Sequence, residues 1–306
     1  MGTPQFALPS LEGLLRDHEV VAVYTQPDRG AGRGRPLAGS PVKKLALDRG
    51  LPVLQPASLK PEREAEGLEG LRPDVIVVAA YGRILPRRVL DIPPLGCLNV
   101  HPSLLPRHRG ASPVASAILA GDEDSGVSIM LLDEGMDTGP ILAQTRQAIG
   151  PGDTTGSLTA RLSELGAGLL LETLARWAEG KLEPRPQGEE AVSNSRPLAR
   201  EDGEIDWRLP ARELDRRLRA FQPWPGCYSR WRGRLLKVIE AVPLPGEGAG
   251  EPGLVRARGR GVGVDTGEGV LELVRVQGEG RGAMSGGEFA RGQPGFVGAV
   301  LPHGRA

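Results

Sequence analysis

Residues 96–113 have the sequence GCLNVHPSLLPRHRGASP, and this stretch decides how the first part of the 306-residue chain is expected to fold. Leu98 and Val100 alternate with Asn99 and His101, which is the pattern of a β-strand whose polar side chains share one face. The proline that follows cannot donate a hydrogen bond to a neighbouring strand, so the strand should end there. Open α/β sheets place their sites at strand ends, and we therefore predict that Asn99 and His101 lie side by side in a site.

A second stretch, EGMDTGPI at residues 134–141, holds a carboxylate in a turn. Asp137 stands among Gly135, Thr138 and Gly139, a composition that brings backbone close and lets N–H groups hold a carboxylate. Taken separately, an edge strand with one wet face would explain the polar pair, and a solvated turn would explain the aspartate. The two stretches together favour a reactive site.

These residues resemble the active site of the folate-dependent formyltransferase family. The family signature is an Asn-x-His strand end, an SLLPxxRG loop and a later Asp in a DxGxDTG-like turn. The matching positions are Asn99 with His101, residues 103–110 and residues 133–139. Three further stretches resemble the members that act on methionyl initiator tRNA, and they are GTPQFALPSLEGLL (2–15), TQPDRGAGRGRPLAGSPVKKLAL (25–47) and AFQPWPG (220–226).

The resemblance implies a transfer of the formyl group from N10 of 10-formyltetrahydrofolate, a co-substrate, to the α-amine of methionine on initiator tRNA. An amine that attacks an amide-like carbonyl creates an oxyanion and leaves a surplus proton on nitrogen. Asn99 would donate to the oxyanion, which contributes about 3 to 4 kcal/mol per donor in acyl-transfer enzymes. His101 would accept the proton or, charged, assist the oxyanion. Asp137 would orient the imidazole and favour its charged form.

Folate binding is assigned through the same resemblance. The implied residues are Ser103, Leu104, Leu105 and Pro106, with Tyr81, Gly82 and Ile84 at the end of the preceding strand. Such a loop offers backbone groups to a pterin and apolar side chains to its flat face. The chain departs from the family at His108, where a Trp is usual, and at Ser112, where an Ala is usual. We interpret His108 as a surface substitution and not as a second catalytic base.

Binding of tRNA is expected to depend on local basic segments, because the formal net charge of the chain is +0. Arg29, Arg33 and Arg35 lie on a glycine-rich segment suited to phosphates or an unpaired acceptor end, and the resemblance favours Arg33. A solvated linker would explain the same segment. Residues 206–237 are also basic, and the predicted contacts there are Arg216, Arg230 and Arg232. Aromatic residues that could stack bases among them are Trp207, Phe221, Trp224 and Trp231.

The chain is long enough for two domains. Apolar runs at 20–25 and 74–80 predict buried parallel strands, and 10–17 and 41–49 have helical spacing. We predict a doubly wound, Rossmann-like α/β formyltransferase domain over 1–182, a linker over 183–203 and a small OB-like β-barrel domain that binds tRNA over 204–306.

The beginning of the chain departs from the family. Members usually start with an apolar strand that runs into the GTP turn, whereas this sequence starts with Met1-Gly2-Thr3-Pro4. We expect the sheet to lack a strand that is normally central, which would expose backbone groups and apolar surface at a cost of several kcal/mol. A misplaced start explains this departure better than a truncated enzyme does.

Composition excludes other classes of protein. The two cysteines, Cys97 and Cys227, form no disulfide framework, and the scattered histidines predict no metal site. The apolar runs are too short to span a bilayer, so we expect a cytoplasmic monomer without membrane contact. Three functions stay open as alternatives: a formyltransferase acting on an amino sugar nucleotide or a ribotide, a hydrolase that releases formate from 10-formyltetrahydrofolate, and a tRNA- or folate-binding module without activity.

Overall fold

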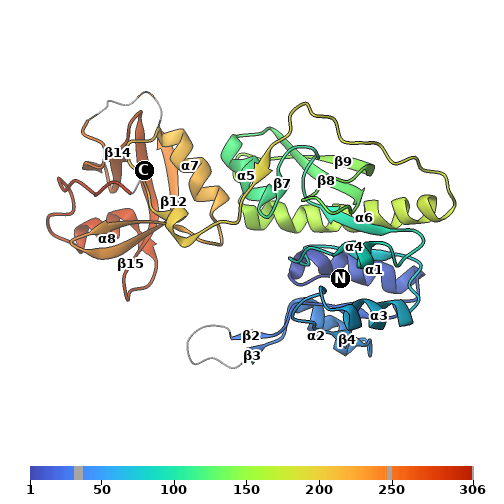
Figure 1. Ribbon diagram of the computed structural model, residues 1–306. Coiled ribbons are helices and arrows are strands. Elements are labelled where there is room, and N and C mark those ends of the chain that lie inside the picture. The colour runs from blue at the N-terminus through green and yellow to red at the C-terminus, as the bar shows by residue number, and fades with distance from the viewer. Residues whose placement is uncertain (31–36, 245, 247–249, 305–306) are drawn as a thin grey trace. The chain divides into compact units, whose positions relative to one another are not determined.

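A computed structural model describes residues 1–30, 37–244, 246 and 250–304 of the chain (Figure 1). The chain divides into two compact units. The first comprises Met1–Val114, Glu123–Ile149 and Leu158–Arg196, and the second comprises Ala115–Asp122, Gly150–Ser157 and Pro197–Ala306.

The first unit contains a four-stranded sheet in the order β5-β6-β8-β9. Its strands are β5 (Ile76–Val78), β6 (Cys97–His101), β8 (Asp124–Leu131) and β9 (Ile141–Ala148). Strands β5 and β6 run parallel, whereas β8 and β9 are antiparallel to their neighbours. The predicted α/β unit is therefore confirmed, with a sheet that is parallel on one side and antiparallel on the other.

Strand β6 has its polar pair on one face. All five of its residues are buried. Helix α6 (Thr155–Ala178) lies along the sheet, and a Cβ added at its Gly166 would come within 2.9 Å of the Val100 side chain. Helix α6 therefore covers the face of Val100, and Asn99 and His101 project from the opposite face. A larger residue at position 166 would force the helix away from the sheet.

The remaining elements of the first unit surround this sheet. They are η1 (Gln5–Ala7), α1 (Leu8–Asp17), β1 (Val23–Tyr24), β2 (Arg29–Gly30), β3 (Leu37–Ala38), α2 (Pro41–Asp48), β4 (Val53–Leu54), α3 (Glu62–Gly70), α4 (Arg87–Leu90), β7 (Arg109–Gly110) and β10 (Asn194–Ser195). Helix α5 (Pro113–Ala120) lies at a boundary between the units. The predicted helices at 10–17 and 41–49 are confirmed as α1 and α2, and the side chain of Ser40 caps α2 by accepting from Lys43 N–H.

The second unit is built on a six-stranded antiparallel sheet in the order β11-β12-β15-β14-β13, with β16 paired to β15. The strands are β11 (Cys227–Trp231), β12 (Arg234–Leu244), β13 (Val255–Arg258), β14 (Gly261–Asp265), β15 (Val270–Gly278) and β16 (Met284–Ser285). Helix α7 (Ala211–Ala220) buries Leu214 and Leu218, and α8 (Gly286–Arg291) starts with a capping box of Ser285 and Glu288. A short 3-10 helix, η2 (Arg200–Gly203), precedes them.

The segment 183–203, for which we predicted a linker, makes hydrogen bonds with other parts of the first unit. Its residues are mostly exposed, but Arg185 exchanges two backbone hydrogen bonds with Ile141, and β10 pairs with β7. The first unit therefore extends to Arg196, and the second begins at Pro197. Proline and charge density in the sequence gave no sign of these hydrogen bonds.

The sheet is interrupted next to β5. Gly2 lies between β1 and β5, since its N–H donates to Tyr24 and it bridges Ala79 in parallel. Beside it lies a cavity of about 1000 Å³, whose lining includes residues 18–24 and 71–77. Among the hydrogen bonds of the described residues, none involves the backbone of Val21 or Ala22. The predicted strands at 20–25 and 74–80 are accordingly short, because each lacks a partner along this cavity.

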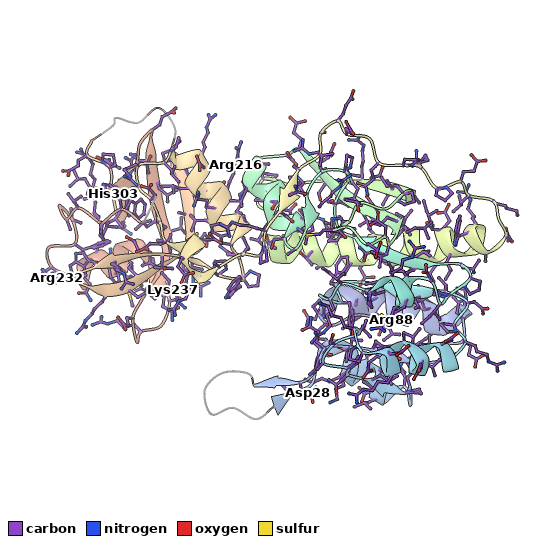
Figure 2. All side chains as sticks on the ribbon, viewed as in Figure 1. Asp28, Arg88, Arg216, Arg232, Lys237 and His303 are labelled. Carbon is purple, nitrogen blue, oxygen red and sulfur yellow. The ribbon has the colours of Figure 1, made fainter. Side chains whose placement is uncertain are left out.

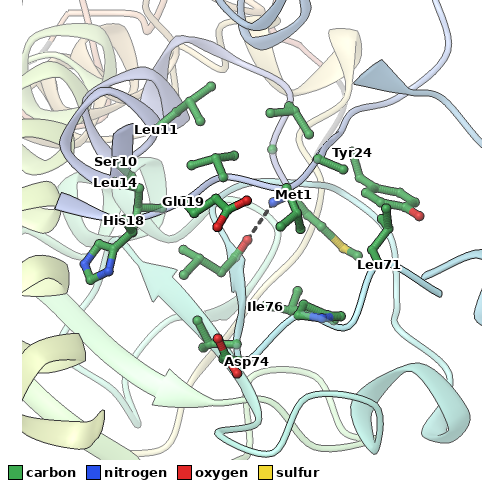
Figure 3. Close-up of a pocket in the computed structure, with 18 of the residues that line it drawn as sticks. Met1, Ser10, Leu11, Leu14, His18, Glu19, Tyr24, Leu71, Asp74 and Ile76 are labelled. Carbon is green, nitrogen blue, oxygen red and sulfur yellow. Dashed lines mark hydrogen bonds between the residues drawn. The ribbon is translucent and has the colours of Figure 1, made fainter. Parts of the chain in front are cut away.

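The amine of Met1 is buried at the end of this cavity. Figure 3 shows its nitrogen directed at the carbonyl oxygen of Val77, at 2.6 Å. Burial lowers the pKa of this amine from 8.0 to about 5. Above pH 8 both the folded and the unfolded chain carry a neutral amine. In a chain that begins at Met1, only the unfolded state gains the proton as the pH falls from 8 to 5, so folding loses up to about 4 kcal/mol.

An apolar extension should therefore stabilise the fold. We expect a variant with five apolar residues added before Met1 to melt at a higher temperature than the 306-residue chain, because an added strand would bury apolar side chains at about 1.5 to 3 kcal/mol each. Its melting temperature should also depend less on pH between 5 and 8. Calorimetry measures both effects. The control is an extension of five Ser and Gly residues, and equal melting of the two extended chains would contradict the expectation.

Candidate active site

The three side chains singled out in the sequence meet in the first unit. Asn99 and His101 project from β6, and Asp137 comes from the turn between β8 and β9. Asn99 Nδ2 donates to Asp137 Oδ1 at 3.3 Å, and His101 Nδ1 lies 3.6 Å from Asp137 Oδ2. The second distance exceeds that of a hydrogen bond, so the carboxylate acts on the imidazole through charge once the imidazole is protonated.

The turn around Asp137 presents its carboxylate to the strand end. The N–H of Gly110 donates to Asp137 Oδ2 at 2.8 Å. Asp137 has a φ of +56°, a left-handed conformation that Asp adopts more readily than most residues. Within the turn, Asp133 accepts hydrogen bonds from the N–H of Gly135 at 3.0 Å and from the hydroxyl of Thr138 at 2.8 Å. Hydrogen bonds from Gly110 and Asn99 thus hold the Asp137 carboxylate, and those of Asp133 hold the turn that carries it.

His101 has one acceptor near each ring nitrogen. Its Nε2 lies 3.2 Å from the carbonyl oxygen of His108. A carbonyl can only accept, so we assign the proton of the neutral imidazole to Nε2, which leaves Nδ1 as the basic nitrogen. Nδ1 faces Asp137, and a proton taken up there would be stabilised by the carboxylate.

Burial lowers the pKa of His101 below its ordinary value. The residue is 3% exposed, and loss of water around the charged imidazole is the largest cause of the shift. The carboxylate of Asp137 and the carbonyl of His108 act in the opposite direction and raise the pKa. The imidazole is therefore neutral at pH 7 and able to accept a proton.

The loop assigned to folate follows β6 directly and is held by polar contacts. Ser128 Oγ donates to the carbonyl of Ser103 at 2.6 Å and accepts from the N–H of Leu105 at 3.1 Å. Gln144 Nε2 donates to the carbonyl of Leu105 at 2.9 Å. The Leu105 side chain lies in the core, whereas Leu104 and Pro106 are partly exposed. This segment therefore has a fixed backbone conformation beside the site.

The weaker folate candidates follow β5, whose Val78 pairs with Asn99. The side chain of Tyr81 is 1% exposed and belongs to the core, so only its backbone is available to a ligand. Gln26 Nε2 donates to the carbonyls of Tyr81 at 2.8 Å and Gly82 at 3.3 Å. Ile84 is 74% exposed and offers apolar surface.

The interpretation of His108 as a surface residue is wrong. His108 is 7% exposed and has a φ of +58°. Its N–H donates to Ser193 Oγ at 2.9 Å, while its carbonyl faces His101. Polar loop composition does not reveal that residues from 193–195 cover this position. His108 thus contacts the site through its backbone.

The basic residues assigned to tRNA differ in their surroundings. Arg33 and Arg35 lie outside the described residues, and Arg29 is described only by its backbone, which pairs in β2 with β3. In the second unit, Arg216 packs over Gly121, where a Cβ would collide with its guanidinium. Nε of Arg230 lies 3.8 Å from Oε1 of Glu204, which makes an ion pair.

Arg232 has partners within its own unit. Its guanidinium lies 4.5 Å from the ring centroid of Trp231, and Nη2 donates to the carbonyl of Pro294 at 3.1 Å. Figure 2 shows Arg232 and Lys237 among the side chains of this unit. Of the aromatic residues considered for stacking, Trp207 and Phe221 are buried and unavailable to bases, whereas Trp224 is 54% exposed.

Several residues at the site were not anticipated. Gln187 contacts the turn of Asp137, Ser193 and Ser195 contact the 108–112 segment, and Ser128 and Gln144 hold the loop after β6. These are isolated Ser and Gln residues without a local pattern, so the sequence offered no signal for them.

Two further kinds of feature concern the described part of the chain, namely groups of metal ligands and long apolar helices. Within it, no group of three or more His, Cys, Asp and Glu is placed to hold a metal ion. Among its helices, none combines the length and apolarity needed to cross a bilayer. Cys97 and Cys227 are buried free thiols, and desolvation raises the pKa of each to about 12.

Comparison with known proteins assigns the chain to a class. The Formyl transferase family matches residues 5–174, and the Formyl transferase C-terminal domain matches residues 197–294. A crystal structure of an N-formyltransferase from Helicobacter canadensis, in complex with folinic acid and dTDP-3-aminofucose, superimposes with a TM-score of 0.66. It is 19% identical and covers 89% of this chain and 97% of that one. The fold and the site define a two-domain formyltransferase.

Relatives with more similar sequences show to which family of formyltransferases the chain belongs. A methionyl-tRNA formyltransferase of Chloroflexus aurantiacus is 50% identical over 296 residues, covering 95% of each chain. One from Thermus thermophilus is 51% identical over 292 residues, covering 95% of this chain and 94% of the relative. The chain belongs to the methionyl-tRNA formyltransferase family.

The contact between His101 and Asp137 predicts the direction of a titration shift. In Asp137→Asn the carboxylate that raises the His101 pKa is lost, so that pKa should fall further below its ordinary value. NMR titration of the imidazole measures it. Glu134→Gln, which neutralises an exposed carboxylate of the same turn, is the control. A His101 pKa that rises or stays constant in Asp137→Asn would show that the two groups do not interact as described.

Proposed function

We propose that the protein transfers a formyl group from 10-formyltetrahydrofolate to the α-amino group of methionine on initiator tRNA. The observation that carries this proposal is the meeting of Asn99, His101 and Asp137 at one strand end. About half of the residues are identical to relatives named methionyl-tRNA formyltransferase, over nearly the whole chain. The proposed acceptor follows from that similarity, and the chemistry follows from the site.

The surroundings of the trio suit a folate. The loops after β5 and β6 lie at the carboxyl ends of adjacent parallel strands, where α/β proteins bind ligands. The segment 103–106 offers a fixed backbone, and the exposed Ile84 offers apolar surface to a flat heteroaromatic ring. We infer that these two loops hold the folate, which supplies a formyl group already activated on nitrogen.

The trio can manage the charge that an amine creates when it attacks a carbonyl. Nδ1 of His101 is the basic nitrogen and accepts the surplus proton. Asp137 then neutralises the imidazolium, whose formation burial would otherwise oppose. Asn99 contributes the amide N–H that stabilises a developing oxyanion. As the oxyanion collapses, the bond from the formyl carbon to N10 breaks, and the imidazolium returns its proton to N10, so that tetrahydrofolate leaves. The reaction needs positioning of two substrates and no covalent intermediate on the protein.

Recognition of tRNA is proposed to use the second unit and the segment 29–35, here called the arginine segment, which contains Arg29, Arg33 and Arg35. Asp28, which precedes Arg29, forms an ion pair with Lys43 at 2.6 Å and accepts from Gln55 at 2.8 Å. Arg33 and Arg35 are proposed to bind phosphates or the acceptor end. Arg216, Arg230 and Arg232 are proposed as contacts of the second unit.

Two other activities provide alternatives. One alternative acceptor is a sugar nucleotide, such as the dTDP-3-aminofucose in the Helicobacter canadensis structure. That structure is 19% identical to this chain, so the similarity supports a shared fold and not a shared acceptor. A hydrolase would use the same trio with water as acceptor.

We expect a cytoplasmic monomer, as befits an enzyme acting on aminoacyl-tRNA, and light scattering after size-exclusion chromatography tests the oligomeric state.

The deciding experiment is incubation with 10-formyltetrahydrofolate and methionyl initiator tRNA. Formyl-methionine should form in wild type, and His101→Ala should lower kcat by about 100-fold or more, because general bases contribute about 10² to 10⁴. Folate affinity should stay within about threefold. Free formate without formyl-methionine would favour the hydrolase, and normal turnover of His101→Ala would remove that residue from the mechanism.

Phosphate contacts by the arginine segment predict a salt effect. Replacing both Arg33 and Arg35 with Ala should weaken tRNA binding and reduce the slope of log K against log salt by about 1.4, because each phosphate contact on a single strand contributes about 0.7. Filter binding at several salt concentrations measures the slope. Arg63→Ala, which changes an exposed arginine on α3, is the control. An unchanged slope would contradict the proposed contacts.

A further inference from the structure

Gln187 makes contacts that the proposed roles of the trio do not use. It lies half-buried in the segment after α6. Its Nε2 donates to the carbonyl oxygens of Asp137 at 2.8 Å and Gly139 at 2.7 Å. Its Oε1 accepts from Nε and Nη2 of Arg109, at 3.0 Å and 2.7 Å. Both ends of the side-chain amide are therefore fully hydrogen-bonded, which fixes its orientation.

These hydrogen bonds join the two segments that meet at the Asp137 carboxylate. One segment is the turn that contains Asp137 itself. The other contains Arg109 and its neighbour Gly110, whose N–H donates to Asp137 Oδ2. Ser195 holds this second segment as well, since its Oγ donates to the carbonyl of Arg109 at 3.0 Å. Gln187 thus binds both segments that form the hydrogen bond from the Gly110 N–H to Asp137 Oδ2.

The backbone of Asp137 needs such support. Its φ of +56° is in the left-handed region, which is unfavourable for a residue with a Cβ and persists where the surroundings enforce it. Gln187 binds the carbonyl of Asp137 and that of Gly139 two residues later, so it spans the strained part of the turn. Loss of both bonds would let the turn relax and move the carboxylate.

We propose that Gln187 is a positioning residue that holds the Asp137 carboxylate against Asn99 and His101, an inference that rests on the proposed formyl transfer. The hydrogen bonds of the described residues connect Gln187 to Asp137 and Arg109, and none connects it to Asn99 or His101. Its effect on the reaction therefore passes through Asp137. Displacement of a catalytic group by about 1 Å can slow turnover by about 100-fold.

The first test is a double-mutant cycle read by the NMR titration of His101. Gln187→Ala should lower the pKa of His101 by about half a unit, in the direction of Asp137→Asn, because the displaced carboxylate no longer supports the imidazolium. In the Asp137→Asn background, Gln187→Ala should change that pKa by less than about 0.3 unit. A shift of equal size in both backgrounds, or no shift in either, would overturn the proposal.

The second test separates turnover from binding. Gln187→Met keeps the side-chain volume without the amide, which guards against a variant that fails to fold. Its kcat should fall at least about tenfold, while KM for folate and tRNA stays within about twofold. Gln147→Met on β9, where the amide donates to the carbonyl of Ala148 and to no other described residue, is the matched control with unchanged kcat. Normal kcat for Gln187→Met, or a rise in KM alone, would overturn the positioning role.

The two tests distinguish failure of this inference from failure of the proposed function. If the wild type forms no formyl-methionine while the pKa cycle is non-additive, the proposed acceptor is wrong and the positioning role stands. If the wild type forms formyl-methionine while the cycle is additive, the function stands and Gln187 has no positioning role.

Discussion

The hydrogen bond from the Gly110 N–H to the Asp137 carboxylate, at 2.8 Å, is the contact on which the site depends. The same carboxylate accepts from Asn99 and lies beside His101. It therefore connects β6, the segment after it and the turn after β8. Hydrogen bonds to a carboxylate are stronger than those to a neutral acceptor, and this gain offsets the strain in the backbone of Asp137.

Burial and charge act against each other at His101. The surrounding sheet and loops remove water from the imidazole and keep it neutral, whereas the carbonyl of His108 favours its charged form. Asp137 supplies the opposite charge that a proton on Nδ1 requires. In the proposed reaction, His101 would be neutral at the start and stabilised as it becomes charged, which is what proton transfer from an amine demands.

The interrupted sheet does not reach this site. Strand β6 is paired on both sides, with β5 and with β8, so Asn99 and His101 lie on a strand that the cavity beside Met1 does not border. Across the interruption, Thr3 and Gln26 both donate to the carbonyl of Tyr81, which ties the two parts of the unit together at the end nearer to the site. The cavity therefore affects the stability of the unit more than the geometry of the trio.

The sequence by itself determined the two-part α/β and β-rich architecture, the strand with its polar pair, and the trio of Asn99, His101 and Asp137, because alternation, turn composition and motif spacing are local properties. It did not reveal the burial of His108 or the hydrogen bonds of Gln187. Those depend on a segment about 80 residues later in the chain returning to the strand end, as the pairing of β10 with β7 shows. A polar residue in a proline-rich, charged stretch looks solvated until the fold supplies its partners, so only the tertiary structure decided which residues hold the carboxylate in place.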